Sequence, residues 1–487
     1  MESDTDNHPE KKKITLTSGQ QNALNRLRSF MSDPDAKVYI LKGYAGTGKT
    51  TLVRMFIDEL NKREVPYSLL ASTGRAAKIL STITGSFAHT VHSEIYKFSQ
   101  LSQDLEQLAQ TEAQPIVDAS GQLYLNFDLV PRDLDENPGV HYYIVDEASM
   151  VSDVKDNNAT QAQFGSGKLL NDLLQYDTLG KFIFVGDICQ LPPIFQQFSP
   201  ALDANYFLSQ YDIKAYESEL TQIMRQSGDN DIVLASQNLR RLYHNPPMQQ
   251  KCATFPLKGF ANIHILNSQA ELINRYVESI RQGGFNTSTM LCCINKQSTQ
   301  ATQILRPIFG HHSMLLEKGD LLLITQNNLI TGLMNGDLVV VEDIGAQYRR
   351  AGLTFVKVTV KELFTGTTYT SLLISEVLYN NGTNISQADH RALFIDFYYR
   401  MKERGIKQKS EEFKRMMMED PYLNALRAVF GYVLTCHKAQ GGEWDNVFID
   451  IPRSYPYMSK PYVYQWLYTA MTRARKELYV VNDYWVK

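Results

Sequence analysis

The chain has 487 residues, of which 43% are hydrophobic and 21% are charged, and its formal net charge at pH 7 is -3. These values predict a globular protein of several domains, and no apolar run has the length that a membrane-spanning helix needs, so no membrane contact is expected. The slight negative charge argues against nucleic acid as a partner unless a basic and aromatic lining forms locally in a cleft.

Cysteine spacing and the first residues indicate where such a protein works. The five cysteines show neither metal-ligand nor disulfide spacing, which favours the reducing cytoplasm. If the source is bacterial, we expect association with the nucleoid. Residues 1–13 are polar throughout and lack the apolar centre of a signal peptide, so we expect a disordered tail.

The first predicted elements are a buried strand over 36–43 and a helix over 50–63. Between them, "GYAGTGKTT" fits the phosphate-loop pattern GxxxxGK[ST]. Strand, glycine turn and helix N-terminus aim backbone N–H groups at one point, which suits ATP. We expect Lys49 at the β- and γ-phosphates and Thr50 on Mg²⁺. The loop residues expected to hold the nucleotide are Gly43, Ala45, Gly46, Thr47, Gly48, Lys49, Thr50 and Thr51.

A second strand pattern, "HYYIVDEASM" at 141–150, ends in two adjacent carboxylates. Asp146 can anchor Mg²⁺, usually through water, and Glu147 can take a proton from the attacking water. Alone, such a pair fits a solvated turn equally well. Downstream of a phosphate loop, it predicts the metal-supporting and general-base residues of an ATPase.

A third strand pattern, "KFIFVGDICQLPPI" at 181–194, ends in Gly186, Asp187 and Gln190. A glutamine at the carboxyl edge of a sheet can sense the γ-phosphate. Asp187 is interpreted as the residue that holds the turn, and the two prolines predict an extended exit from it.

Two later segments supply arginines. Arg225 lies in "ELTQIMRQS", and Arg473 and Arg475 lie in "WLYTAMTRARKELYVV". An arginine that reaches the γ-phosphate from a second lobe stabilises transition-state charge and makes hydrolysis depend on lobe closure. For any single arginine, the alternative is a surface salt bridge.

Taken in order, these strings resemble the motif series of superfamily 1 (type B) DNA helicases, in particular the RecD/Dda-like group that includes the Pif-type enzymes. The resemblance covers most of the chain, from residue 16 to residue 475. The matching strings are "LTSGQQNAL", "GYAGTGKTT", "ASTGRAAK", "TVHS", "IVDEASM", "GDICQLPP", "LTQIMRQ", "TCHKAQGGEWDNV" and "YTAMTRAR".

The resemblance implies further nucleotide contacts. Gln20 would read adenine, Gln190 would couple the γ-phosphate to the strand-binding cleft, and Arg225 and Arg473 would be the arginine fingers. In "QGGEWD", Gly442 and Glu443 would lie at the nucleotide, with Glu443 at the ribose. An exposed loop carboxylate is the alternative for Glu443.

The resemblance also implies a set of strand-contacting residues. Hydroxyl, backbone N–H and imidazole groups can hold a single strand without reading its sequence. A structural histidine is the alternative interpretation of His92. The DNA-binding residues implied are Thr73, Thr90, His92, Thr435, His437 and Lys438.

The resemblance implies an α/β fold, with two RecA-like parallel-sheet lobes that form a P-loop NTPase and two insertions. The first lobe is expected over 14–92 and 141–218, and the second over 219–340 and 429–487. The alternating pattern in the insertion over 93–140 predicts a hairpin around Ser120 and Gly121. The resemblance implies that Tyr124 or a turn residue of this hairpin abuts a DNA fork; the hairpin could equally just cover the first lobe. The insertion over 341–428 is predicted to be β-rich, and the resemblance implies an SH3-like module there. Its charged run, "MKERGIKQKSEEFKRMMMED", fits a solvated helix face.

The function expected is ATP-dependent DNA unwinding, with ATP-driven closure of the two lobes on single-stranded DNA and on single-strand/duplex junctions. The resemblance implies 5′ to 3′ movement, whereas the residues themselves show no direction. Two alternatives stay open: a nucleotide-gated binding switch or protein remodeller, and an RNA-directed superfamily 1 helicase.

Overall fold

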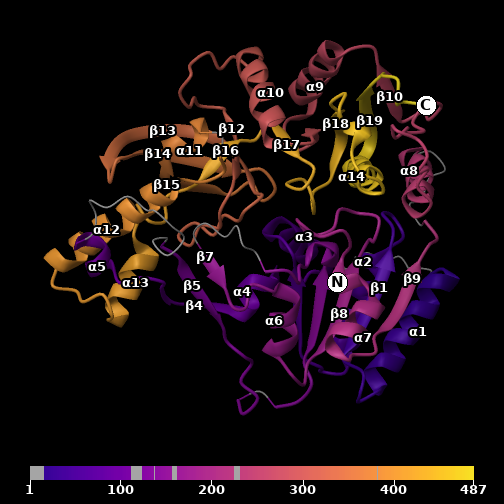
Figure 1. The fold of residues 1–487 in the computed structure, drawn as a ribbon, viewed down its shortest axis with the longest axis horizontal. Coiled ribbons are helices and arrows are strands. Elements are labelled where there is room, and N and C mark those ends of the chain that lie inside the picture. Colours follow the sequence, from indigo (N-terminus) through magenta and orange to yellow (C-terminus); the bar gives the residue numbers. More distant parts are fainter. Residues whose placement is uncertain (1–15, 111–122, 137, 156–161, 224–230, 381) are drawn as a thin grey trace, which may run out of the picture.

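A computed structural model describes residues 16–110, 123–136, 138–155, 162–223, 231–380 and 382–487. Within these residues there are four sheets, two of them wholly parallel, so the predicted α/β class is confirmed. Figure 1 shows one parallel sheet in the lower half of the molecule, the other at the upper right, and the orange antiparallel sheet to the left. Each described helix is too short or too polar to cross a membrane.

The lower parallel sheet has the order β3-β2-β6-β8-β1-β9. Apolar clusters cover both of its faces, which explains why its strands read as continuous hydrophobic runs. Its strands are β1 (Val38–Gly43), β2 (Tyr67–Ala71), β3 (Ala88–Thr90), β6 (Tyr142–Asp146), β8 (Lys181–Gly186) and β9 (Tyr216–Leu220). Its helices are α1 (Ser18–Ser32), α2 (Lys49–Lys62), α3 (Gly74–Thr84), α4 (Val91–Ile95), α6 (Leu169–Tyr176) and α7 (Ala204–Tyr211).

The upper parallel sheet has the order β10-β19-β18-β11-β17. It combines strands from the middle of the chain with strands from its end, and one apolar cluster packs around it. The strands are β10 (Ile263–Leu266), β11 (Ser288–Cys292), β17 (Val433–Thr435), β18 (Trp444–Asp450) and β19 (Ala474–Val481). The helices are α8 (Asp231–His244), α9 (Gln269–Gly283), α10 (Asn295–Ile308) and α14 (Tyr462–Met471).

The antiparallel sheet has the order β15-β14-β13-β12-β16, and one isolated bridge between Leu373 and Leu426 links its two edge segments. The β-rich character predicted for this region is confirmed; an SH3-like barrel remains a prediction. The strands are β12 (Leu321–Ile324), β13 (Leu338–Arg350), β14 (Leu353–Glu362), β15 (Thr368–Ile374) and β16 (Ala428–Phe430). The helices are α11 (Ser375–Tyr379), α12 (Gln387–Glu403) and α13 (Glu411–Glu419).

A small three-stranded sheet projects from the lower half. It contains β4 (Tyr96–Leu101), β5 (Leu125–Leu129) and β7 (Ala162–Phe164), and α5 (Leu105–Gln110) follows β4. The turn predicted at Ser120 and Gly121 lies outside the described residues. The strand after it pairs antiparallel with β4, and Tyr124 exchanges backbone and side-chain hydrogen bonds with Ser102.

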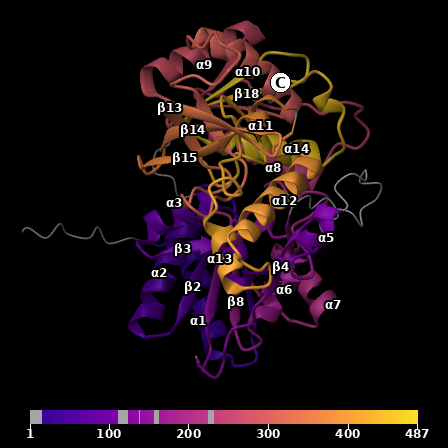
Figure 2. The same ribbon diagram turned by 90° about the vertical axis from the view of Figure 1, so that its left-hand side faces the viewer.

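The two insertions touch each other. Apolar side chains of α5 and α12 share one buried cluster, and Figure 2 shows the orange helices α12 and α13 beside the purple elements of the lower half. The strands of the antiparallel sheet begin at Leu321, and the predicted domain limits, including the one at residue 340, remain predictions.

The antiparallel sheet is joined to the upper parallel sheet by a two-residue link, because β16 ends at Phe430 and β17 begins at Val433. Beside this link, Asp320 is fully buried. Its carboxylate accepts hydrogen bonds from Arg306 Nε and Nη2, over 2.9 and 2.8 Å, and from the Tyr432 hydroxyl over 2.8 Å.

We expect Asp320→Ala to lower the free energy of unfolding by about 3–5 kcal/mol, because it leaves the buried Arg306 guanidinium without its carboxylate. The measurement is chemical denaturation followed by circular dichroism. As a control, Glu411→Ala removes an exposed ion pair with Lys414 and is expected to change stability by less than about 0.5 kcal/mol. Equal effects of the two substitutions would contradict this account.

Candidate functional site

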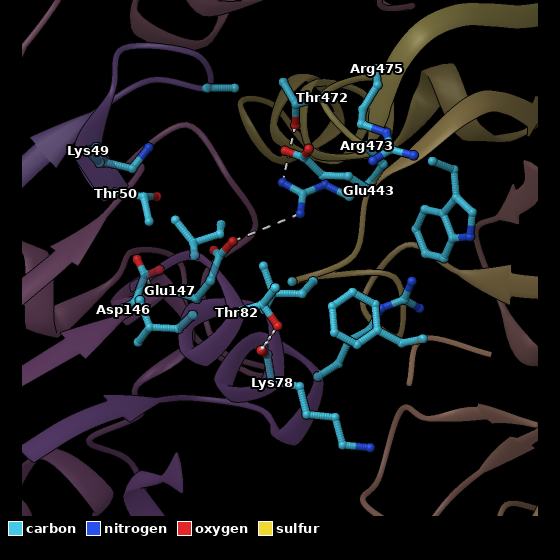
Figure 3. A pocket seen from close by; sticks show the side chains of 18 of the residues that line it. Lys49, Thr50, Lys78, Thr82, Asp146, Glu147, Glu443, Thr472, Arg473 and Arg475 are labelled. Atoms are coloured by element: carbon cyan, nitrogen blue, oxygen red, sulfur yellow. Dashed lines mark hydrogen bonds and ion pairs between the residues drawn. The ribbon is translucent and has the colours of Figure 1, made fainter. Parts of the chain in front are cut away.

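A cavity of about 620 Å³ lies between the lower half of the molecule and the upper parallel sheet. Figure 3 shows that Lys49, Thr50, Asp146 and Glu147 enter it from the purple elements, and that Glu443, Thr472, Arg473 and Arg475 enter it from the yellow ones. The cavity lies at the carboxyl ends of β1, β6 and β8, the edge at which parallel sheets bind ligands. The predicted nucleotide residues that line it are Ala45, Gly46, Gly48, Lys49, Thr50, Thr51, Asp146, Glu147, Gln190, Glu443 and Arg473.

The phosphate loop has the predicted strand–turn–helix form. Gly46 and Gly48 have φ angles of 77° and 82°, a region that L-residues with a Cβ rarely adopt. Gly43 is constrained differently, because a Cβ there would lie 2.8 Å from Thr47 Oγ1. Lys49 Nζ donates to the carbonyl of Gly43 over 2.7 Å, so the loop holds its own lysine at the cavity wall.

The two carboxylates at the end of β6 share one environment. Burial, and then the charge of Glu147, raise the pKa of Asp146, and a cation close to this pair would favour the ionised form. Thr50 lines the same cavity. A hydroxyl and a carboxylate are hard oxygen ligands that suit Mg²⁺, which usually takes few protein ligands and keeps several waters. The residues present therefore fit this metal.

Glu147 has a left-handed backbone, with φ at 50°, a conformation that costs free energy in a non-glycine residue and often marks a functional position. Its Oε1 lies 4.0 Å from Arg473 Nη1. With the Gln190 amide oriented to complement its neighbours, its Nε2 donates to Glu147 Oε2 over 3.2 Å and its Oε1 accepts from Arg473 Nη2 over 3.0 Å. Glu147 directly follows β6, Gln190 lies in the turn after β8, and Arg473 directly precedes β19, so these three residues connect the two halves.

Arg473 is held firmly in this position. It is 4% exposed, and its guanidinium donates to the carbonyls of Thr469 and Gly442 over 3.1 and 3.3 Å. Gly442, predicted at the nucleotide, thus supports the arginine. Arg475 also lines the cavity, but its guanidinium pairs with Asp445 over 2.8 Å.

Of the predicted nucleotide residues that the structure describes, four do not line the cavity: Gln20, Gly43, Thr47 and Gly442. Gln20 is buried, and its amide is engaged within the protein: Nε2 donates to the carbonyl of Thr47, and Oε1 accepts from the Thr17 N–H. Thr47 is 1% exposed, with its hydroxyl on the Tyr44 carbonyl. Arg225 lies outside the described residues.

Helix α3 contributes cavity residues that the sequence analysis did not select. Arg75, Lys78, Ile79 and Thr82 line the cavity, and their i, i+3, i+4, i+7 spacing marks one helix face. The Arg75 guanidinium lies 4.2 Å from the ring centre of Trp444 in the upper half. Within "ASTGRAAKILST", residues 71–82, this spacing was the signal that could have found them.

A second cavity, of about 580 Å³, lies between the lower half and the antiparallel insertion. Thr73, Thr90 and His92, three of the predicted strand-contacting residues, line it. Thr73 and Thr90 are the N-caps of α3 and α4, and their hydroxyls accept the N–H groups of Ala76 and Ser93.

Aromatic rings that the sequence analysis did not select lie in the same cavity. Phe127 stacks on Phe164, with ring centres 4.8 Å apart, and Phe98 packs edge-on against Phe127. His390 and Arg427 line the cavity from the insertion side. The three phenylalanines come from three strands of the small sheet, so the sequence has no local pattern that unites them.

A third cavity, of about 420 Å³, lies between the upper half and the insertion and is lined by Lys438. Residues 382–384 border both this cavity, through Thr383, and the second one, through Asn384. Thr435 and His437 line neither cavity; Thr435 ends β17 and is 8% exposed.

Residues 15–245 match the AAA domain family, and residues 430–481 match the UvrD-like helicase C-terminal domain. The chain is 24% identical to the ATP-dependent RecD2 DNA helicase of Deinococcus radiodurans, over 97% of this chain and 50% of that protein. It is 42% identical to the ATP-dependent DNA helicase dda of Enterobacteria phage T4 over 79 residues, which are 16% of this chain and 18% of that helicase. The chain spans at most half the length of either relative.

Among solved structures, a Pif1 helicase from Bacteroides in complex with ADP-AlF3 and ssDNA is similar at a TM-score of 0.49 and 16% identity, over 97% of this chain and 93% of that one.

The phosphate loop, the two parallel sheets and the arginine that reaches from one half to the other define a P-loop NTPase with its site between two lobes. The two family matches cover parts of both lobes. Together, the family matches and the relatives support a superfamily 1 (type B) helicase of the RecD/Dda/Pif-like group.

Burial lowers the pKa of His92 to about 4. The unfolded chain, with its histidine pKa near 6.5, therefore binds a proton that the folded chain refuses, and stability falls as the pH drops from about 6.5 towards 4. We expect His92→Gln to reduce this pH-dependent loss of unfolding free energy by about 1–3 kcal/mol. The measurement is urea unfolding across that pH range. The exposed His312→Gln is the control; an unchanged slope in His92→Gln would contradict the argument.

Proposed function

We propose that the chain is an ATP-dependent DNA helicase that moves along single-stranded DNA as ATP binding closes the two lobes and hydrolysis releases them. The observation that carries the proposal is the contact of Arg473, from the upper half, with Glu147 and Gln190 of the lower half. Charge that develops on the γ-phosphate during hydrolysis needs a cation there. Hydrolysis thus becomes sensitive to the relative position of the lobes.

In this proposal, five side chains of the first cavity have a defined role. Lys49 and the loop N–H groups bind the phosphates, and Mg²⁺, held by Thr50 and Asp146, would neutralise phosphate charge when bound. Glu147 accepts a proton from the attacking water. Gln190 links the general base to the arginine and so conveys the state of the site to the turn after β8.

The strand would run through the second and third cavities. Thr73, Thr90 and His92 face the second cavity and Lys438 the third, and residues 382–384 border both. Because burial keeps His92 neutral, its imidazole would stack on a base or share a hydrogen bond with it. The phenylalanine group adds a stacking surface that accepts any base.

The finer parts of the proposal come from the resemblance. They are 5′ to 3′ movement, action at single-strand/duplex junctions, and a strand-separating role for the first insertion near Tyr124. The lobe limits given above belong to the same proposal. A fork-unwinding assay with 5′ and with 3′ overhangs tests direction and junction use together.

Single-stranded DNA is expected to stimulate ATP hydrolysis, and Lys49→Ala and Glu147→Gln are each expected to lower the stimulated rate by about 100-fold or more, since they remove the phosphate cation and the general base. Glu278→Gln, at an exposed position on α9, is the control and should keep the wild-type rate. Wild-type hydrolysis that is equally fast without DNA would favour a nucleotide-gated switch or remodeller.

Binding of a fluorescent deoxythymidine oligonucleotide is expected to weaken steeply as salt increases. Lys438→Gln should reduce the slope of log affinity against log salt by about 0.7, the value for one phosphate contact on a single strand. Lys62→Gln, on α2 and outside the cavities, should leave the slope unchanged. Tighter binding of the matching ribo-oligonucleotide, with greater stimulation of hydrolysis, would support the RNA-directed alternative instead.

A further inference from the structure

A tyrosine of the upper half reaches into the phosphate loop of the lower half. Tyr468 lies near the end of α14 and is 1% exposed. Its hydroxyl donates to Asp187 Oδ2 over 2.6 Å and accepts the backbone N–H of Ala45 over 3.2 Å. One hydroxyl group therefore connects three segments that are far apart in the sequence.

Both partners of this hydroxyl belong to segments that build the nucleotide site. Ala45 lies inside the phosphate loop, between Gly43 and Lys49. Asp187 directly follows β8 and shapes the turn that leads to Gln190: its Oδ1 accepts from the Cys189 N–H over 2.9 Å, and its carbonyl accepts from the Gln190 N–H over 3.2 Å. Movement of the Asp187 carboxylate would therefore move the turn that carries Gln190.

The same helix contacts this turn at two further points. Thr469 Oγ1 accepts the Leu191 N–H over 2.8 Å, and Gln465 Nε2 donates to the Gln190 carbonyl over 3.3 Å. Arg473 follows α14 after a single residue. Helix α14 thus positions Arg473 next to Glu147. The same helix fixes the turn that carries Gln190, the other residue of the lower half that Arg473 contacts.

We propose that Tyr468 is a positioning residue for ATP hydrolysis. When the lobes are closed, its hydroxyl fixes the position of the phosphate loop relative to the turn that carries Gln190. The inference rests on the proposed function. Asp187 is buried, 1% exposed, and without the hydroxyl one of its oxygens loses a short hydrogen bond, which disfavours the closed arrangement. The residues expected to hold the phosphates lie in the lower half, so ATP binding should depend on Tyr468 much less than hydrolysis does.

The test is Tyr468→Phe, which removes only the hydroxyl. Tyr464→Phe is the matched control, because Tyr464 lies one turn earlier in α14, is also fully buried, and has a hydroxyl without a hydrogen-bond partner among the described residues. We expect Tyr468→Phe to lower the DNA-stimulated kcat about tenfold, the change that one hydrogen bond to a charged group supports. KM for ATP and Tm should stay near their wild-type values, and Tyr464→Phe should leave all three quantities unchanged.

Asp187→Asn completes a double-mutant cycle. If the hydroxyl acts through Asp187, the double variant Asp187→Asn/Tyr468→Phe should be no slower than the slower single variant. Two results would overturn the inference: an unchanged kcat in Tyr468→Phe, or multiplicative losses in the double variant. Because wild-type hydrolysis with and without DNA is measured first, failure of the proposed function is seen separately, as a wild type that hydrolyses no ATP or ignores DNA.

Discussion

The architecture depends on one buried charge, the Arg473 guanidinium at the seam between two parallel sheets. A cation 4% exposed loses most of its hydration, and this loss is tolerated only where carbonyl and carboxylate oxygens replace the water. Two backbone carbonyls and Glu147 do so here. Since Glu147 and Gln190 belong to the opposite half, the arginine is best satisfied when the halves are together, and separating them leaves it short of partners.

The features that depend on interactions between residues close in the sequence were predicted best. The strand–turn–helix form of the phosphate loop was predicted because its geometry is set by its own glycines, and the position of the DE pair because it ends a strand of the same sheet. In both cases the deciding interactions lie within a few residues along the chain or along one strand. The class with two parallel sheets was implied instead by the resemblance of the whole motif series to a helicase family.

Long-range contacts were not predictable in the same way. Asp187 was interpreted as a turn residue, which it is, but its contact with Tyr468 spans 281 residues. Arg75 stacks on Trp444 across the seam, and no pattern in either segment indicates this. Gln20 shows the reverse case: a residue type that suits base recognition has both ends of its amide engaged within the protein. To contact adenine as predicted, Gln20 would have to break these two hydrogen bonds.

The two-residue link between β16 and β17 has a mechanical consequence. Backbone on both sides of it is locked into hydrogen-bonded ladders, and a Cβ at Gly431 would lie within 3.2 Å of the main chain of β12, so the joint has little room to bend. We therefore expect the antiparallel insertion and the upper sheet to move together as one rigid body. If the lobes open and close as proposed, the distance between the insertion and Thr73 would widen and narrow with them.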